Sequence, residues 1–230
     1  MTPKSTLLDH VLGLLETGLD TTGAWKPAQR IRRIQQNRKG GLTSEEIESI
    51  TILLTNDYSR RMNAQYEGMF MKRRTAILTQ LDHVVVENVA DNLEEELIAV
   101  ELNLKELEKY IGAIEKTHQS VLKEEDDKPF GRAIKAHWKR KNWQLSKQLR
   151  EDCARRGGCC ARGCGCCEKQ RSELRPGVVG HCTFACGCCE QARGYEVEDY
   201  EAMDIGDNYE ILVKGNCRTD SIMKAYVWGV

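Results

Sequence analysis

The chain has 230 residues with 34 basic and 35 acidic side chains, so at a formal charge of −1 the molecule as a whole is neither strongly basic nor strongly acidic. Charged residues make up 30% and there are only three Phe and four Trp, which favours long solvent-exposed helices over one thick core. No stretch approaches the about 18 apolar residues of a membrane span, and the N-terminus lacks the features of a signal peptide. We therefore expect an intracellular protein, cytoplasmic or nuclear, in a reducing compartment.

Residues 1–42 are predicted to form an N-terminal helix followed by a basic arm. The helix is indicated by apolar residues that fall on one face, namely Leu7, Leu8, Val11, Leu14 and Leu15. The arm is the segment "KPAQRIRRIQQNRKGG", which ends in two glycines that favour a flexible link.

Residues 43–126 are predicted to be helical, because Thr43 and Glu46 form a capping-box pair and no proline follows before Pro129. A heptad seam marks the second half of this region, with its members at Leu97, Val100, Leu104, Leu107, Ile111, Ile114, His118 and Val121. Asn92 and Glu95 are typical of a fresh helix start, which predicts a hairpin broken near Asp91. The seam has two interpretations, packing within the chain or self-association through residues 92–125 as a coiled coil.

Residues 127–152 are predicted to be a basic amphipathic helix that begins at Pro129. Residues 128–175 contain fourteen Lys/Arg against four Asp/Glu. In the tail, 196–230, an acidic segment precedes two β-prone stretches that are predicted to pair as a small hairpin.

Ten of the eleven cysteines lie between Cys153 and Cys189, among many glycines and few core-forming residues. A segment of this kind must be held by metal or by disulfides. Thiols in a reducing compartment favour Zn²⁺, so residues 153–195 are predicted to be a zinc-stapled module. A disulfide framework and a metal-buffering or redox-sensing thiol protein are the alternatives.

The module contains a repeat, "CARGCGCCEKQR" at 160–171 and "CTFACGCCEQAR" at 182–193. Each copy carries a Cys-x-x-Cys pair whose intervening glycine permits the tight turn of a zinc knuckle. Adjacent side chains point apart, so neighbouring cysteines are predicted to serve different ions. The symmetric solution has two zinc ions, one held by Cys164, Cys167, Cys186 and Cys189 and the other by Cys160, Cys166, Cys182 and Cys188. Cys153, Cys159 and His181 remain as possible extra ligands.

The segments "LREDCARRGGCCARGCGCCEKQR" and "GHCTFACGCCEQARGYE" resemble a cysteine-rich C-terminal segment that recurs in uncharacterised fungal proteins. The helical "RRMNAQYEGMFMKRRTAILTQLDH" and "HWKRKNWQLSKQLR" are similar to the region that precedes it, so the resemblance covers residues 43–195. It implies a fungal intracellular module, and it assigns no activity and no catalytic residues.

The sequence therefore predicts a mainly α protein, with a long helical hairpin or coiled coil, an irregular zinc-stapled module and a short β-prone tail. No catalytic motif occurs, so we expect a non-catalytic zinc-binding interaction or scaffold protein. The alternative is a nuclear nucleic-acid-binding protein, because basic residues beside aromatics contact phosphates and stack on bases. Its candidate residues are Lys139, Arg140, Lys141, Trp143, Arg155, Arg156 and Arg162.

Overall fold

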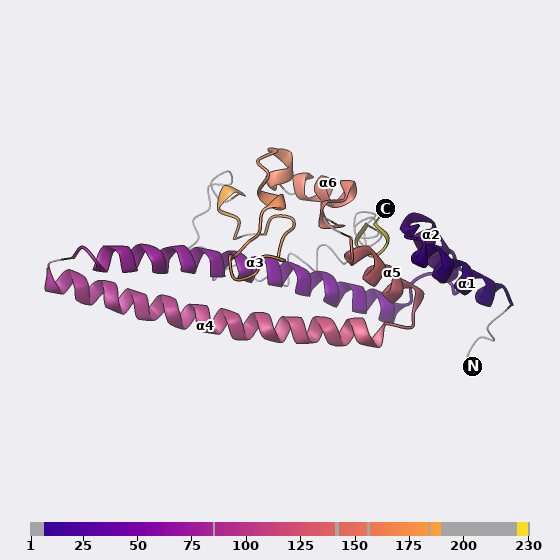
Figure 1. Ribbon diagram of the computed structural model, residues 1–230, viewed down its shortest axis with the longest axis horizontal. Coiled ribbons are helices and arrows are strands. Elements are labelled where there is room, and N and C mark those ends of the chain that lie inside the picture. Colours follow the sequence, from indigo (N-terminus) through magenta and orange to yellow (C-terminus); the bar gives the residue numbers. More distant parts are fainter. Residues whose placement is uncertain are drawn as a thin grey trace. The chain divides into compact units, whose positions relative to one another are not determined.

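The computed structural model describes residues 7–84, 86–140, 143–155, 157–183, 185–189 and 225–229 (Figure 1). These residues are mainly helical and include no strand. The helices are α1 (Leu7–Thr21), α2 (Trp25–Arg38), α3 (Ser44–Leu81), α4 (Glu87–Glu124), α5 (Pro129–Trp138) and α6 (Lys147–Arg155), with short 3₁₀ turns η1 (Trp143–Leu145), η2 (Cys159–Ala161) and η3 (Cys166–Glu168). Within this part of the chain no helix is both long enough and apolar enough to cross a bilayer.

The chain divides into two units, each assembled from segments that are distant in sequence. Unit 1 comprises Met1–Leu54, Gln119–Leu149 and Gly206–Val230, and unit 2 comprises Thr55–His118 and Arg150–Ile205. The predicted β-prone tail lies largely outside the described residues. Its described end at 225–228 is helical and belongs to unit 1, so the tail gives no support to the predicted hairpin.

In unit 1, the segment predicted as a basic arm is the helix α2. Sequence periodicity missed it because the face that α2 buries is polar, and its buried side chains include Gln29, Arg32, Gln35 and Gln36. These groups find partners: Gln29 donates a hydrogen bond to the Ala133 carbonyl at 3.0 Å, and Arg32 pairs with Glu16 at 2.8 Å. Hydrogen bonds and ion pairs therefore replace apolar contacts at this helix.

The apolar face of α1, predicted from the leucine spacing, points toward solvent in unit 1. Leu7 is 83% exposed and Leu14 is 76% exposed, while the buried residues of this helix are Leu12 and Glu16. An exposed apolar face on an amphipathic helix is a feature that marks interaction surfaces.

The predicted capping box at the start of α3 is confirmed. The Thr43 amide donates to Glu46 Oε2 at 2.9 Å, and the Glu46 amide donates to Thr43 Oγ1 at 3.2 Å. The apolar core of unit 1 then forms between α3, the end of α4, α5 and the C-terminal turn. Its buried members are Ile50, Leu53, Leu54, Leu122, Phe130, Ala133, Ile134, Tyr226, Val227 and Trp228.

The predicted basic amphipathic helix is interrupted after Trp138, although it begins at Pro129 as expected. Positions five apart on a continuous helix point about 140° away from each other. Because the helix ends, Trp143 stacks on Trp138 with ring centroids 5.1 Å apart, and both rings meet Tyr226 edge-on at 5.3 Å. The break therefore lets Trp143 pack beside Trp138 against the core of unit 1.

His137 lies under this aromatic cluster, stacked against Trp25, and is fully buried. Neither of its ring nitrogens has a hydrogen-bond partner among the described residues. Burial, together with the charge of Arg140, lowers the pKa of His137 to about 4. The neutral imidazole is therefore the form compatible with the folded state.

We expect acid to destabilise unit 1 through His137. The unfolded chain binds this proton near pH 6.5, so the contribution of His137 is complete above that pH and is lost as the pH falls toward 4. Between pH 7.5 and 4.5 the free energy of unfolding should fall by about 2–3 kcal/mol more in the native protein than in His137→Phe. Urea unfolding followed by tryptophan fluorescence measures this, since all four tryptophans belong to unit 1. Equal pH dependence in the two proteins would contradict it.

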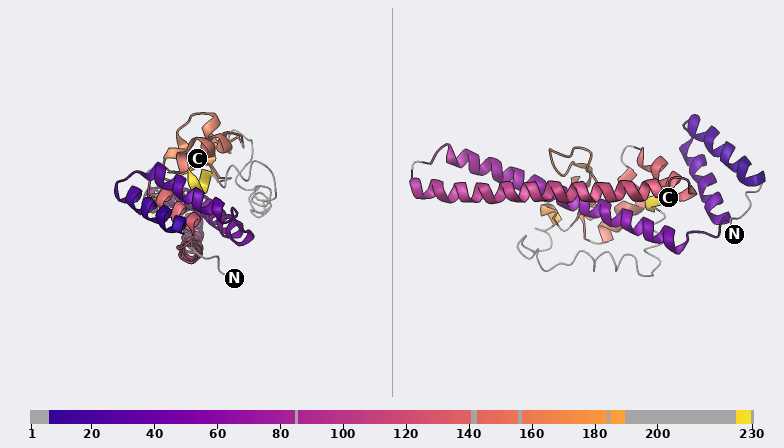
Figure 2. Two further views of the ribbon diagram at one scale, coloured as in Figure 1. Left: turned by 90° about the vertical axis from the view of Figure 1, so that its right-hand side faces the viewer. Right: turned by 90° about the horizontal axis from the view of Figure 1, so that it is seen from below.

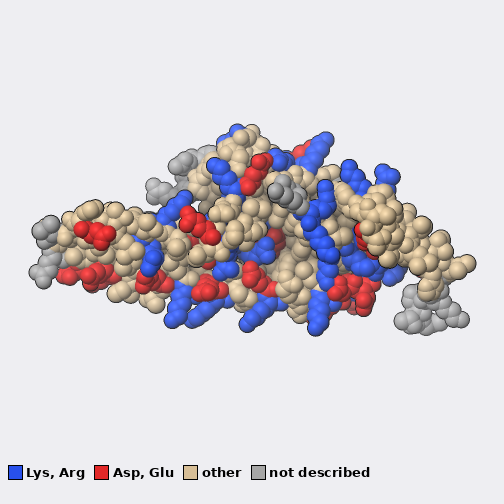
Figure 3. Space-filling view, viewed as in Figure 1, with Lys and Arg blue, Asp and Glu red and all other residues tan. Residues whose placement is uncertain are grey.

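In unit 2, residues 55–81 of α3 and residues 87–118 of α4 lie side by side and antiparallel (Figures 1 and 2). Ion pairs join them, with Arg73 to Glu96 at 2.5 Å and Arg74 to Glu101 at 3.1 Å. The seam residues Val100, Ile111, Ile114 and His118 are buried, while acidic and basic side chains alternate along the exposed face of α4 (Figure 3). The seam therefore packs within the chain.

The hairpin breaks earlier than predicted. α3 ends at Leu81 and α4 begins at Glu87, so Asp91 and Asn92 lie inside α4. Asn92 is tolerated there because it is exposed to water.

Candidate metal centre

The described cysteines come from short elements in the second half of unit 2. Cys153 lies on α6, Cys159 and Cys160 on η2, and Cys166 and Cys167 on η3. The turn after α6 needs glycine at Gly158, where a Cβ would lie 2.4 Å from the Cys153 sulfur. Gly165 adopts a left-handed φ of 72°, which is the tight turn predicted for the first repeat. Gly187, in contrast, begins a helical turn through Cys189.

Ten cysteines and His181 converge into three groups of four ligand atoms, and within each group all atoms lie within 4.8 Å of one another. The groups are Cys153, Cys160, Cys167 and His181; Cys159, Cys164, Cys166 and Cys188; and Cys159, Cys182, Cys186 and Cys189. Each group is close enough to hold a metal ion.

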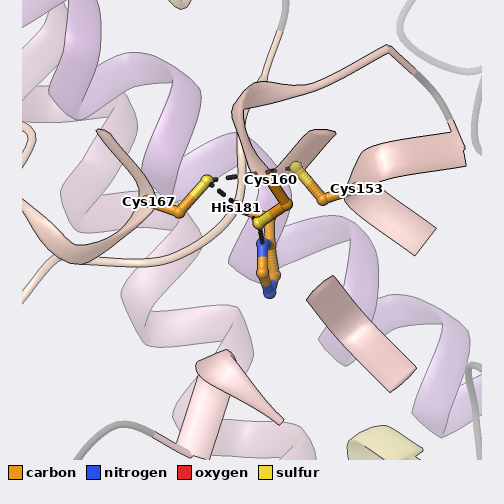
Figure 4. A group of neighbouring side chains, drawn as sticks. All are labelled: Cys153, Cys160, Cys167 and His181. Carbon is orange, nitrogen blue, oxygen red and sulfur yellow. Dashed lines mark hydrogen bonds between the residues drawn. The ribbon is translucent and has the colours of Figure 1, made fainter. Parts of the chain in front are cut away.

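The distances in these groups fit tetrahedral coordination. Zinc–sulfur bonds of about 2.3 Å place two sulfurs of one tetrahedral ion about 3.8 Å apart. In the histidine-containing group, the Cys167 sulfur lies 3.9 Å from that of Cys153 and 3.7 Å from that of Cys160 (Figure 4). His181 turns Nδ1 toward the Cys160 sulfur at 3.3 Å, so three sulfurs and one nitrogen surround a common point.

The grouping differs from the symmetric solution that the sequence favoured. Each adjacent pair, such as Cys166 and Cys167, is divided between two groups, which is the division expected from neighbouring side chains. Cys186 and Cys189 stay together, but Cys164 and Cys167 separate, because Cys167 turns toward Cys153 on α6. The residues predicted as extra ligands, Cys153, Cys159 and His181, are therefore full members of the groups.

Contacts between thiols shift their proton affinities in opposite directions. The pKa of Cys186 is lowered to about 4, chiefly by its hydrogen bond with the Cys182 thiol, and the pKa of Cys182 is raised, chiefly by its hydrogen bond with Cys153. The pKa of exposed Cys164 is lowered to about 7 by a backbone hydrogen bond from Cys166. Thiolates, the form that binds metal, are thus favoured at particular positions of the cluster.

A guanidinium lies against the sulfurs. Arg162 Nη2 donates to the Cys189 sulfur at 2.9 Å and to the Cys159 sulfur at 3.8 Å. A fixed cation at this distance offsets part of the negative charge that thiolate ligands bring to a metal centre.

The module also contacts the polar middle of α3. Arg175 pairs with the buried carboxylate of Glu67 at 3.2 Å, and Thr183 donates a hydrogen bond to Gln65. The buried polar residues of this helix segment are Asp57, Ser59, Arg61, Asn63, Gln65 and Glu67. The cysteine-rich module thus supplies polar partners for Gln65 and Glu67 of this helix.

We expect alanine to have opposite effects on stability at Gly68 in α3 and at Gly112 in α4. A Cβ at Gly68 would lie 2.5 Å from the backbone oxygen of Arg171, whereas a Cβ at Gly112 would meet nothing within 4 Å. Gly68→Ala should destabilise the docked module by about 1–3 kcal/mol. Gly112→Ala should stabilise α4 by up to about 1 kcal/mol. Amide exchange of residues 171–180 measures the first effect, and equal protection in both variants would contradict the docking.

The described residues among those predicted for nucleic-acid binding are distributed over both units. Lys139 and Arg140 are exposed in unit 1, while Trp143 is half-buried in the aromatic cluster. In unit 2, Arg155 pairs with Glu151 at 3.8 Å and Arg162 contacts the sulfurs. Lys141 and Arg156 lie outside the described residues.

Comparison of the chain with protein-family models, with curated proteins and with solved structures found no match. The fold and the site by themselves define a mainly helical protein with a cysteine-rich candidate metal centre.

Proposed function

We propose that this is a non-catalytic zinc-binding interaction or scaffold protein of a reducing compartment, the cytoplasm or nucleus. The observation that carries the proposal is the convergence of ten cysteines and His181 into groups of four. Thiolate-rich sets of four suit Zn²⁺, and a closed set of four protein ligands leaves no open position for substrate or water. The resemblance to a fungal intracellular module agrees with this assignment.

Metal content and thiol state together test the zinc assignment. The full chain, purified under reducing conditions without added metal, should retain zinc by elemental analysis and contain no disulfide. Addition of a mercury reagent that displaces zinc from thiolates should release the metal in proportion to the thiols titrated. A metal-free, disulfide-bonded protein would reject the proposal, and so would metal held with no thiol involved.

Two exposed apolar faces support the interaction role. One is the face of α1 that includes Leu7 and Leu14, and the other is the face of α4 that includes Ile98 and Leu102, each 59% exposed. The second face lies within residues 92–125, where self-association was expected, but on the opposite side from the buried seam. Sedimentation velocity of Leu14→Lys and Leu102→Lys tests which face joins two copies. A native chain that stays monomeric at all concentrations would show that self-association is not part of the function.

Nucleic-acid binding is the second candidate function, favoured by one surface of unit 1. A cavity of about 350 Å³ is lined by Lys26, Arg30 and Arg33 together with Trp25 and Trp228. The Arg140 guanidinium lies 3.5 Å from the centre of the Trp25 ring. Lys26, Arg30 and Arg33 are exposed, and no ion pair joins them to any residue that the structure describes. Cations beside aromatic rings suit phosphates next to unstacked bases.

Binding of a labelled single-stranded oligonucleotide, followed by fluorescence anisotropy over a range of salt concentrations, tests this candidate. Arg30→Ala/Arg33→Ala should weaken binding at least about tenfold and reduce the salt slope by about 1.4. The matched control is Lys105→Ala/Lys109→Ala on the exposed face of α4, which should change neither. Equal effects of both pairs, or no binding at low salt, would reject the candidate.

A further inference from the structure

The three ligand groups are not independent, because Cys159 belongs to two of them. Three groups of four have twelve ligand positions, but only eleven residues, ten cysteines and His181, fill them. The numbers differ by one because the Cys159 sulfur fills a ligand position in two groups.

We propose that the module holds three divalent metal ions, two of which are bridged by the Cys159 thiolate. The inference rests on the proposed zinc function and departs from the two separate ions expected from the sequence. In the buried group, the Cys159 sulfur lies 3.4 Å from that of Cys189 and 3.8 Å from that of Cys186, close to the edge of a tetrahedral site. Toward the other group, the sulfurs of Cys164, Cys166 and Cys188 all lie within 4.8 Å of it.

A bridge completes the coordination of every ion with residues of the chain. Without it, the group of Cys164, Cys166 and Cys188 would offer three ligands and leave a fourth position for water. Within this group the sulfurs of Cys164 and Cys188 are 3.6 Å apart, which is close to the edge of a tetrahedral zinc site. Structural zinc sites are closed by four protein ligands, and sharing Cys159 lets these eleven residues close all three groups.

Charge supports the bridge at this position. Ten thiolates with three dications carry a net charge of about −4, which needs nearby cations. Arg162 contacts Cys159 and Cys189, both members of the buried bridged group, so its charge lies beside the thiolate that two ions share.

The bridged pair combines a buried ion with an exposed one. All four ligands of the group with Cys182, Cys186 and Cys189 are buried, whereas Cys164 is exposed and Cys166 and Cys188 are partly exposed. A chelator should therefore remove the outer ion first, and Cys159 then becomes an ordinary ligand of the inner one. Metal loss should pass through a two-ion state.

The full chain, loaded with an NMR-active cadmium isotope, tests the bridge. Native mass spectrometry should find three ions, and the cadmium spectrum should show three signals, of which two are mutually split through the shared sulfur. The third, unsplit signal should have the shift of a site with three sulfurs and one nitrogen. Cys188→Ser, which alters only the outer group, should leave two ions and abolish the splitting.

The outcomes separate the bridge from the zinc function. Three unsplit signals, or saturation at two ions, would overturn the bridge and leave the zinc assignment intact. A chain that binds no cadmium would overturn both. The spectrum of the native chain alone decides whether two ions share a sulfur. The test therefore does not require a Cys159→Ser variant to fold.

Discussion

Removal of metal by a strong chelator under reducing conditions is expected to abolish the amide protection of residues 157–189. Apart from cysteines, the only described apolar side chains buried in that segment are Val178 and Ala185. A buried valine contributes about 2 kcal/mol, whereas structural zinc contributes about 10–16 kcal/mol of apparent binding free energy in small zinc-dependent folds. Protection factors should therefore fall at least about 100-fold, as measured by hydrogen exchange with mass spectrometry.

Helices α2 and α5 of unit 1 provide the internal control. They carry no member of the metal groups, and the described residues of the apolar core of unit 1 include no cysteine. Their exchange should change little on chelation. Unchanged protection of 157–189 would mean that polar contacts such as the hydrogen bond from Arg175 to Glu67 hold the module without metal.

Sequence predicted two kinds of feature in this fold. One is the helix that buries a regular row of apolar side chains, and the other is the helix start marked by a local capping motif. The seam at Ile111 and Ile114 is of the first kind, and the capping box at Thr43 is of the second. Helix α2 was missed because it buries Arg32 and Gln36 rather than leucines. Partners for such side chains lie far along the chain, as Ala133 does for Gln29, and no local pattern reports them.

Some features of the candidate metal centre could likewise be predicted from the sequence, and others could not. The ligand types and the separation of adjacent cysteines follow from local geometry, so sequence could predict them. Grouping depends on which turns meet in space, and here Cys153 on α6 reaches Cys167, fourteen residues further on. The signal available in the sequence was Gly157–Gly158, since a glycine beside Cys153 lets its sulfur approach the chain.

Replacement of Glu16 is expected to destabilise unit 1 strongly. Its side chain accepts hydrogen bonds from Arg32 at 2.8 Å and from Arg132 at 3.0 and 3.2 Å. Glu16 and Arg32 are only 5% and 2% exposed. Glu16→Ala leaves the Arg32 guanidinium buried with Asp20 as its remaining acidic partner, which should reduce the free energy of unfolding by about 3–5 kcal/mol. Urea unfolding followed by tryptophan fluorescence measures the loss.

The ion pair between Asp9 and Arg38 is the matched control, because both its side chains are 38% exposed and it also joins α1 to α2. Asp9→Ala should reduce stability by less than about 1 kcal/mol. The double variant Glu16→Leu/Arg32→Met should recover part of the loss, since removing both charges ends the burial of an uncompensated one. Glu16→Ala with an effect as small as Asp9→Ala would show that water reaches Arg32, and the polar core of unit 1 would then contribute little to its stability.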